Sequence, residues 1–184
     1  MKIFRSIKGT HDILPEDSYK WRHLESIVHQ VCAQFGYQEI RTPIFEQNKL
    51  FSRSVGEESD IVTKEMYSWE DKDNSFLTLR PELTAPIVRA YNQHKLGNLS
   101  PIHRFYYIGP LFRRERPQKG RQRQFHQFGV EAFGSNNPEQ DVEIIAIAWK
   151  ILSLCGLADD TTLNLNSIGS NECLSHIHIS EPTR

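Results

Sequence analysis

A dense run of cations between residues 113 and 123 is the part of the sequence best suited to chemistry. It contains six cations against the single acid Glu115, namely Arg113, Arg114, Arg116, Lys119, Arg121 and Arg123. The planar fork of arginine binds phosphate oxygens in pairs, so a polyphosphate or an RNA backbone is the natural ligand. A solvated hairpin tip is the structural alternative. Hairpin loops usually take about two to five residues, however, and a loop of this length is more often functional.

Glycine-rich phosphate loops are absent from the sequence, because neither G-x-x-x-x-G-K-[ST] nor G-x-G-x-x-G occurs. A nucleotide would therefore have to be held by side chains and a sheet rather than by the backbone of a glycine loop. This argues against P-loop kinases and dinucleotide dehydrogenases.

The segment that follows the basic loop alternates in a way that suggests a binding surface. Phe125, Gln127, Gly129 and Glu131 occupy every second position, so in a strand they share one face. At about 3.3 Å per residue this face spans roughly 20 Å, enough for an adenosine phosphate joined to an amino acid. Phe125 would stack on a base, and Gln127 would be a polar anchor. Gly129 would leave room for substrate, and Glu131 would hold a cationic or donor group. Ordinary sheet alternation with a solvated polar side remains the alternative.

Glu82 and Thr84 form a second polar pair, in the first turn of a helix that we expect Pro81 to open. A glutamate there stabilises the helix dipole, which is a sufficient structural reason for its presence. The functional alternative is an anion that holds the ammonium group of an amino acid. The spacing alone leaves both readings open.

The elements that must position these residues follow from hydrophobic periodicity and turn signals. We expect helices over residues 21–35, 81–94 and 138–155, the last with Val142, Ile145 and Trp149 turned inward. We expect strands over residues 37–42, 65–69, 76–79, 104–114, 124–133 and 161–166. Strands outnumber the crossovers that parallel pairing needs, so the predicted class is α+β, with an antiparallel sheet flanked by helices.

The composition of the 184 residues indicates a soluble globular protein, with 38% hydrophobic residues and a net charge of -1. The longest apolar run, residues 144–149, is far short of the roughly 20 residues that span a bilayer, so we expect no membrane association and a cytoplasmic location. Cys32, Cys155 and Cys173 form no C-x-x-C pair. They predict reduced thiols rather than disulfides or a zinc site.

Several separated segments resemble one known family. Residues 112–115 (FRRE), the basic loop and residues 121–125 (RQRQF) are similar to motif 2 of class II aminoacyl-tRNA synthetases. Residues 116–121 (RPQKGR), 124–131 (QFHQFGVE), 8–12 (KGTHD) and 79–82 (LRPE) resemble the histidine-specific members, the histidyl-tRNA synthetases. Residues 36–43 (GYQEIRTP) resemble motif 1. The likeness extends from Lys8 to about Cys173.

The resemblance implies a six-stranded antiparallel catalytic sheet flanked by helices. It implies a homodimer formed through the motif 1 region at Pro43. The implied reaction activates histidine with ATP, in the presence of Mg2+, and then loads it onto tRNA(His). No resident metal site is implied.

Site residues carried over from the family fall into three groups. Arg113 is the implied catalytic residue, which grips the α-phosphate of ATP, and the implied ATP-binding residues are Arg113, Glu115, Arg121 and Phe125. The implied histidine-binding residues are Glu82, Thr84 and Gln127 at the α-amino end and Glu131 at the imidazole. Arg116 and Gln118 are implied to approach the acceptor end of the tRNA.

The sequence departs from the family pattern in three places. Leu83 stands where many members have glycine. Motif 3, with a second catalytic arginine, and the anticodon-binding domain are missing, so we expect this chain alone not to aminoacylate tRNA. Residues 1–173 are expected to be the N-terminal part of the catalytic core. Residues 174–184 fit nothing in the family and resemble a translated sequencing adapter, and their two histidines, His176 and His178, lack the further ligands that a metal needs.

Other functions remain as alternatives. The main one is the synthetase-like regulatory subunit of ATP phosphoribosyltransferase, a protein of histidine biosynthesis that binds and regulates but charges no tRNA. The intact FRRE segment, the complete basic loop and Phe125 favour the enzyme. A synthetase for proline, threonine or glycine is disfavoured by the amino-acid sequence of residues 127–131. A folded fragment with a binding role only is a third possibility, disfavoured because missing strands would expose apolar sheet edges.

Overall fold

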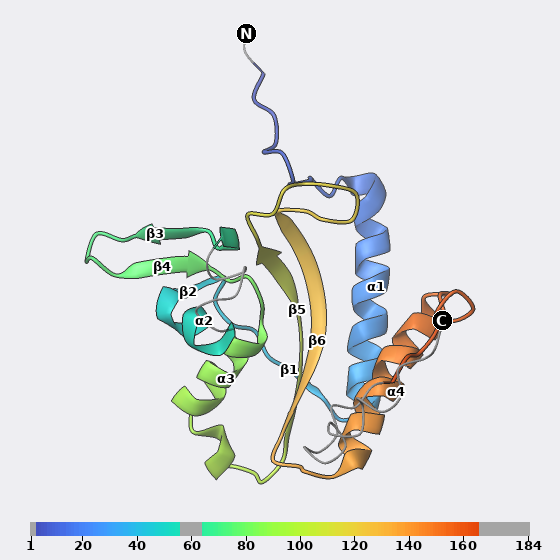
Figure 1. The fold of residues 1–184 in the computed structure, drawn as a ribbon. Coiled ribbons are helices and arrows are strands. Elements are labelled where there is room, and N and C mark those ends of the chain that lie inside the picture. Colours follow the sequence, from blue (N-terminus) through green and yellow to red (C-terminus); the bar gives the residue numbers. More distant parts are fainter. Residues whose placement is uncertain (1–2, 56–63, 166–184) are drawn as a thin grey trace, which may run out of the picture.

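A long two-stranded hairpin organises the chain in the computed structural model, which describes residues 3–55 and 64–165 (Figure 1). The helices are α1 (Pro15–Gln34), α2 (Asn48–Val55), α3 (Thr84–Gln93), the short 3-10 helix η2 (Leu96–Asn98) and α4 (Pro138–Leu154). The strands are β1 (Gln38–Glu39), β2 (Phe45–Gln47), β3 (Ser68–Glu70), β4 (Phe76–Leu79), β5 (His103–Phe112) and β6 (Gln124–Phe133).

The hairpin of β5 and β6 is antiparallel over ten residue pairs, from His103 opposite Phe133 to Phe112 opposite Gln124. Within the described residues, β1-β5-β6 form one sheet and β2-β4-β3 a second, smaller one. The second sheet is antiparallel throughout. The prediction of an α+β fold with antiparallel strands and flanking helices is confirmed, with one exception, because β1 runs parallel to β5.

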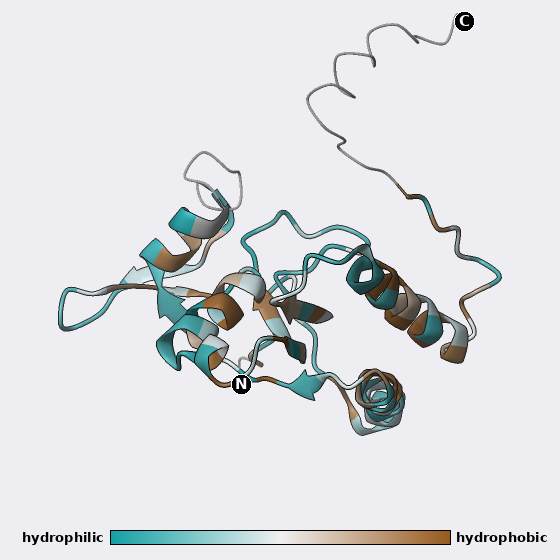
Figure 2. Cartoon of the chain, turned by 90° about the horizontal axis from the view of Figure 1, so that it is seen from below, coloured by the Kyte–Doolittle hydropathy of each residue, from teal (hydrophilic) through white to brown (hydrophobic). Residues whose placement is uncertain are grey.

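Helices cover both faces of the hairpin. Helices α1 and α4 lie together on one side of the strands, whereas α3 and the smaller sheet lie on the other (Figures 1 and 2). Successive residues of β5 serve the two sides, because Tyr106 packs with α1 and α4 while Phe105 and Tyr107 pack with α3. The hairpin therefore separates two hydrophobic cores, and it carries polar residues at the α3 side.

The start of α3 differs from the prediction. Pro81 does not open the helix, which begins at Thr84 after Leu83. In a helix beginning at Pro81, its carbonyl would accept the amide of Ala85. Instead that carbonyl accepts the Nε of Arg113 at 2.9 Å, and the Ala85 amide donates to the carboxylate of Glu82 at 3.1 Å. Glu82 therefore lies outside the helix and caps its first turn, a contact that local sequence does not reveal.

The inward face of α4 was also predicted wrongly. Its buried residues are Gln140, Ile147 and Ile151, whereas Val142 is 65% and Trp149 is 40% exposed. Residues two positions apart on a helix differ by about 200°, so a core face through 140 and 147 turns 142 and 149 outward. Figure 2 shows hydrophobic residues on the ribbon of this helix.

Other element boundaries moved for simple reasons. Helix α1 begins at Pro15 rather than near Trp21, since proline suits the first helical position and acids follow it there. The first strand shortens to β1, and β3 begins at Ser68. Residues 161–165 form no strand and pair with no strand among the described residues, while Asn166 lies outside them.

Three further observations concern the described residues alone. No helix there is long and apolar enough to cross a bilayer. No group of three or more metal-binding side chains gathers there. Cys32 is buried and free, and burial raises the pKa of its thiol to about 11, which keeps it protonated. Cys173 and residues 174–184 lie outside the described residues.

Candidate functional site

The basic loop between β5 and β6 is held by its own backbone and by a segment from the N-terminus. The amide of Arg113 donates to the carbonyl of Arg123 at 3.0 Å, and Gln118 and Arg121 exchange two backbone hydrogen bonds around Gly120. The amides of Arg123 and Gln124 both donate to the carbonyl of Gly9, at 2.7 and 3.2 Å. The loop is thus a defined structure, with Arg116 and Gln118 exposed on it.

Gly9, in the KGTHD segment, occupies a position that only glycine fits well. Its φ of +90° is a conformation that side chains disfavour, and a Cβ there would lie 2.8 Å from Cγ of Arg123. The N-terminal segment can therefore approach the returning arm of the loop only with glycine at this position.

Arg113, Glu115, Arg121 and Phe125 are brought together at the base of the loop. The guanidinium of Arg113 lies 5.2 Å from the centroid of the Phe125 ring. Its Nη1 lies 3.8 Å from Oε1 of Glu115, and Nη1 of Arg121 lies 3.3 Å from Oε2 of Glu115. The Glu115 side chain is only 12% exposed, and it forms ion pairs with both arginines. These pairs hold the two guanidinium groups near Glu115. The cluster presents cations and an aromatic ring, which suits a nucleotide.

Glu82, Thr84 and Glu131 form a second cluster on the α3 side of the hairpin. The hydroxyl of Thr84 donates to Oε1 of Glu131 at 2.7 Å. Burial raises the pKa of both Glu82 and Glu131, and the charge of Glu131 raises that of Glu82 further. Two partly buried carboxylates near each other favour a cationic ligand, since it would relieve both burial and repulsion.

The two clusters adjoin each other. Arg113 donates a hydrogen bond to the carbonyl of Pro81, the residue before Glu82. The charge of Arg113 also lowers the pKa of Glu82, which opposes the effect of burial. Phe125 and Glu131 lie on the same strand, in the odd-numbered register predicted for the site face. The alternation is confirmed, because Phe125 packs with the α3 core while His126 contacts Trp21 of α1.

Gln127 and Gly129 differ from the rest of the predicted site. Gln127 is exposed, and among the described residues no hydrogen bond joins it to the clusters. Gly129 does not leave room for a substrate, because the ring of Tyr107 fills the space above it. A Cβ on Gly129 would lie 2.2 Å from the Tyr107 hydroxyl. Tyr107 stands directly opposite Gly129 in the hairpin register, so pairing the two strands residue by residue would have revealed it.

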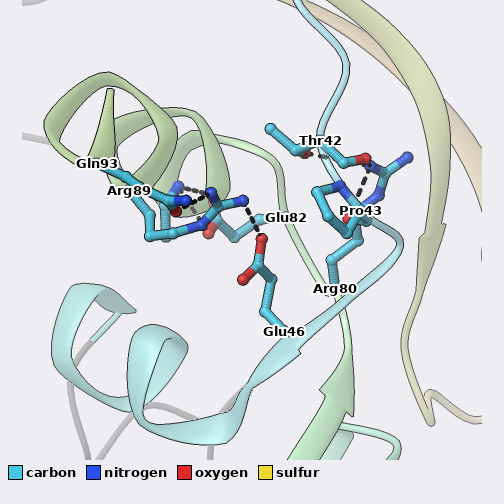
Figure 3. A network of polar contacts seen from close by, with 8 residues as sticks. Thr42, Pro43, Glu46, Arg80, Glu82, Arg89 and Gln93 are labelled. Atoms are coloured by element: carbon cyan, nitrogen blue, oxygen red, sulfur yellow. Dashed lines mark hydrogen bonds and ion pairs between the residues drawn. The ribbon is translucent and has the colours of Figure 1, made fainter. Parts of the chain in front are cut away.

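A cavity of about 800 Å³ opens beside Glu82 and Thr84, between α3 and α2. Its other lining residues are Leu50, Arg53, Ala85, Val88, Arg89, Asn92 and Gln93. Arg89 pairs with Glu46 and donates to Gln93 at 2.9 Å (Figure 3). The wall of this cavity is therefore set by an ion pair between α3 and β2.

Arg80, just before the site, ties three segments together and is only 4% exposed. It donates to the carbonyls of Thr42 at 2.8 Å and Pro43 at 3.3 Å (Figure 3). It also donates to the carbonyl of Pro110 at 3.0 Å. Burial lowers the pKa of its guanidinium. The segment at Pro43 is thereby fixed to β5 and to the turn that carries Glu82.

The comparison with known proteins identifies the family. The sequence profile described as histidyl-tRNA synthetase matches residues 9–180. The chain belongs to the histidyl-tRNA synthetase family. It is 53% identical over 170 residues to the histidine–tRNA ligase of Chloroherpeton thalassium, a match that covers 92% of this chain and 40% of that protein. It is 54% identical over 166 residues to that of Desulforamulus reducens, covering 90% and 39%. The chain thus spans about 40% of the length of these relatives.

Solved structures agree with the family fold. Apo histidyl-tRNA synthetase of S. aureus superposes with a TM-score of 0.70 at 42% identity, covering 84% of this chain and 35% of that one. A Bacillus halodurans protein, described as an ATP phosphoribosyltransferase regulatory subunit/histidyl-tRNA synthetase, has a TM-score of 0.72 at 28% identity, covering 85% and 39%. The fold is shared by both, and sequence identity is higher with the synthetase.

Proposed function

We propose that the protein to which this chain belongs is a cytoplasmic histidine–tRNA ligase, and that this chain carries much of its activation site. The observation that supports it is the arginine cluster at Phe125 adjoining the carboxylate cluster at Glu131, on one face of β6. The first suits ATP and the second suits the cationic groups of histidine.

In the proposed first step, the carboxylate of histidine attacks the α-phosphorus of ATP. A carboxyl oxygen to phosphorus bond forms, the bond to the bridging oxygen breaks, and pyrophosphate leaves with that oxygen. Arg113 would stabilise the negative charge that gathers on the phosphoryl oxygens. Glu115 would fix Arg113 and Arg121 against the phosphates, and Phe125 would take the adenine. The chain supplies positioning and electrostatics, and no residue of it becomes covalently modified.

The histidine end of the site is assigned to the carboxylate cluster. Glu131 would accept an N–H of the imidazole, and Glu82 would face the α-ammonium group. Thr84 already donates to Glu131, so its first role is to hold that carboxylate. Gln127 would reach the ammonium group only after its exposed side chain turns toward the cluster.

The positions of exposed residues suggest where tRNA would bind and where a homodimer would form. Arg116 and Gln118 are exposed on the loop, where they would meet the acceptor end of tRNA(His). The motif 1 segment at Pro43, fixed by Arg80, would lie at the interface of a homodimer.

Mg2+ would arrive with ATP. It prefers oxygen ligands, and it is commonly held by one or two carboxylates together with substrate phosphates and water. Glu115, the carboxylate at the base of the loop, faces two arginines. Glu115 is therefore not placed to hold a magnesium ion at the base of the loop.

The arginine cluster argues against the regulatory-subunit alternative. A protein that only senses histidine needs the carboxylate cluster but not Arg113, Glu115 and Arg121 in mutual contact beside an aromatic ring. Their contacts, together with the higher identity to the S. aureus synthetase, favour the ligase.

The test is ATP–pyrophosphate exchange by the full-length protein that contains this chain, with each of several amino acids. Exchange should depend on histidine and should fall roughly a hundredfold or more in Arg113→Ala, because a transition-state contact is lost. Arg114→Ala is the matched control, since its guanidinium lies over Tyr67 instead, 5.9 Å from the ring centroid. Histidine binding without exchange in the unsubstituted protein would instead support the regulatory subunit.

A further inference from the structure

The N-terminal turn at residues 7–10 presents one buried residue, Gly9, to the basic loop. Residues 3–8 and 11–17 are exposed on either side of it. Figure 1 shows this part of the chain beside the loop that joins β5 and β6. The turn is closed, because both the amide and the hydroxyl of Thr10 donate to the carbonyl of Ile7, at 2.9 and 2.7 Å. A closed turn holds the Gly9 carbonyl in one direction, toward the loop.

The Gly9 carbonyl takes the place of one hydrogen bond of the hairpin. Two residues that form a hydrogen-bonded pair in an antiparallel ladder normally exchange two bonds. Arg113 and Arg123 exchange one, from the Arg113 amide to the Arg123 carbonyl at 3.0 Å. The Arg123 amide donates to Gly9 at 2.7 Å instead, and the Gln124 amide donates to the same carbonyl at 3.2 Å. The strand pairing therefore ends at Phe112 and Gln124, and the two arms of the loop begin at Arg113 and Arg123.

Gly9 also lies between these two arms. A Cβ built on it would come within 2.8 Å of Cγ of Arg123 on the returning arm and 3.0 Å of Cγ of Pro117 on the outgoing arm. Its φ of +90° adds strain for any residue with a side chain. The spacing of the arms at the mouth of the loop is thus set by the backbone of a residue outside the hairpin.

The residues held in this way adjoin the ATP cluster. Arg123 receives Arg113 at its carbonyl and contacts Gly9 through its amide, so a single residue joins the N-terminal turn to Arg113. Gln124, the second donor to Gly9, directly precedes Phe125, whose ring centroid lies 5.2 Å from the Arg113 guanidinium. Both sides of the contact between arginine and ring are therefore anchored next to Gly9.

We propose that Gly9 is a positioning residue for the ATP end of the site: its carbonyl holds the returning arm where Arg113 pairs with it, and thereby fixes Arg113 beside Phe125. The inference rests on the proposed function for the choice of ATP as the ligand. It deepens that function, because none of the roles carried over from the family falls on residues 8–12. The histidine end should be independent of Gly9, since both of its carboxylates take their hydrogen bonds from α3.

The experiment replaces Gly9 with alanine in the full-length protein. The added Cβ should push the turn away from the loop, because two side chains occupy the space it needs. We expect the KM for ATP in pyrophosphate exchange to rise about tenfold, with the KM for histidine within about twofold. Hydrogen–deuterium exchange should become faster in the peptide that contains Arg123 and Gln124, since their amides lose their acceptor.

Gly156, just after α4, gives a matched control. Its φ is +72°, and a Cβ there would meet nothing within 4 Å. Gly156→Ala therefore imposes the same kind of backbone strain without a new contact. It should leave both KM values and the amide exchange of the loop unchanged.

A second variant removes the acceptor without adding strain. A protein shortened to begin at His11, after an initiating methionine, lacks the Gly9 carbonyl and should show the same rise in the KM for ATP. A protein shortened to begin at Ile7 retains the turn, and it should behave like the unsubstituted protein.

Each outcome decides the inference. Faster exchange of the loop amides with an unchanged KM for ATP overturns it, because the contact would then be structural only. Equal losses for ATP and histidine, a rise in the KM for ATP without faster amide exchange, or the same rise in Gly156→Ala also overturn it.

Failure of the proposed function has a different signature. If the unsubstituted protein performs no exchange, the ligase function fails, and the Kd for ATP, measured by calorimetry in the same variants, then decides the role of Gly9. Binding about tenfold weaker in Gly9→Ala supports that role, and unchanged binding overturns it. If the unsubstituted protein binds no ATP, both fail.

Discussion

Two carboxylates, Glu82 and Glu131, are partly buried without a cation bound directly to either among the described residues. Each meets only hydrogen-bond donors of α3, the Ala85 amide for Glu82 and the Thr84 hydroxyl for Glu131. Burial raises the pKa of both. The proposed histidine site thus holds two carboxylates whose charge is not compensated, and this lowers the stability of the free protein at neutral pH.

Glu131→Gln should therefore raise stability while it weakens histidine binding. The folded pKa of Glu131 lies above the usual value of 4.5, so the folded state binds more protons as the pH falls through this range. Its charge destabilises the fold above that range and not below it. We expect a higher Tm for the variant at pH 8, no difference near about pH 4, and a histidine Kd raised at least about tenfold.

The control for this prediction is Glu139→Gln, at an exposed position in the first turn of α4. Thermal unfolding of the two variants across pH gives the comparison. A lower Tm for Glu131→Gln at pH 8 would contradict the account of an uncompensated carboxylate.

The residues of the candidate site were largely predictable, and two of the exceptions share one cause. Arg113, Glu115, Arg121, Phe125 and Glu131 were predicted, and the structure brings them together in two adjoining clusters. Tyr107 was missed and Gly129 was misread because their contact depends on the register of two strands.

At the scale of elements, strand alternation was read correctly and helix contacts were not. A period of two follows from the backbone, so the two faces of β6 could be assigned from the sequence alone. The start of α3 depends on Arg113, 32 residues away from Pro81, and the phase of α4 depends on a polar network. Local pattern carries no information on either.

That polar network joins the beginning of α4 to β5 and to Tyr37, the residue before β1. Tyr37 donates to Oε1 of Glu143 at 3.0 Å, Gln140 donates to the same oxygen at 2.8 Å, and Arg104 does so at 3.0 Å. Burial alone would raise the pKa of Glu143, but these hydrogen bonds and the charge of Arg104 lower it. The network fixes which face of α4 meets the core.

Glu143→Gln should destabilise the protein by about 1 kcal/mol at pH 7, because three donors lose a charged acceptor. The folded pKa of Glu143 is lowered, so its contribution is present above the unfolded pKa and is lost as the pH falls through the folded one. Denaturant unfolding at pH 7 and pH 3 measures this. Asp141→Asn, exposed on the same helix, is the control. A difference that persists undiminished at pH 3 would show that charge is not the cause.

At the scale of the whole molecule, the described residues leave apolar surface uncovered. Trp149, Leu154 and Leu157 are 40 to 47% exposed along and just after α4, and Val142 is more so. The chain spans about 40% of the length of its relatives. Patches of this kind usually mark contacts with other protein surface.

The 184 residues produced alone should show no histidine-dependent pyrophosphate exchange above background, whereas the full-length protein should show it. The physical reason is that the second catalytic arginine expected from the family does not occur in this sequence. Parallel assays at equal concentration of folded protein, verified by circular dichroism, make the comparison. Exchange by the short chain within about tenfold of the full-length rate would mean that Arg113 suffices.

Both faces of β6 are packed, and this limits how the hairpin can change in length. Inserting or deleting a single residue within β6 would exchange the faces, so that Glu131 would turn toward α1 and Val130 toward α3. Insertions between residues 116 and 120 would leave the strand register intact. Length variation among natural homologues, and any grafted sequence, should therefore be confined to the loop, where it would alter what approaches the site and leave the site itself unchanged.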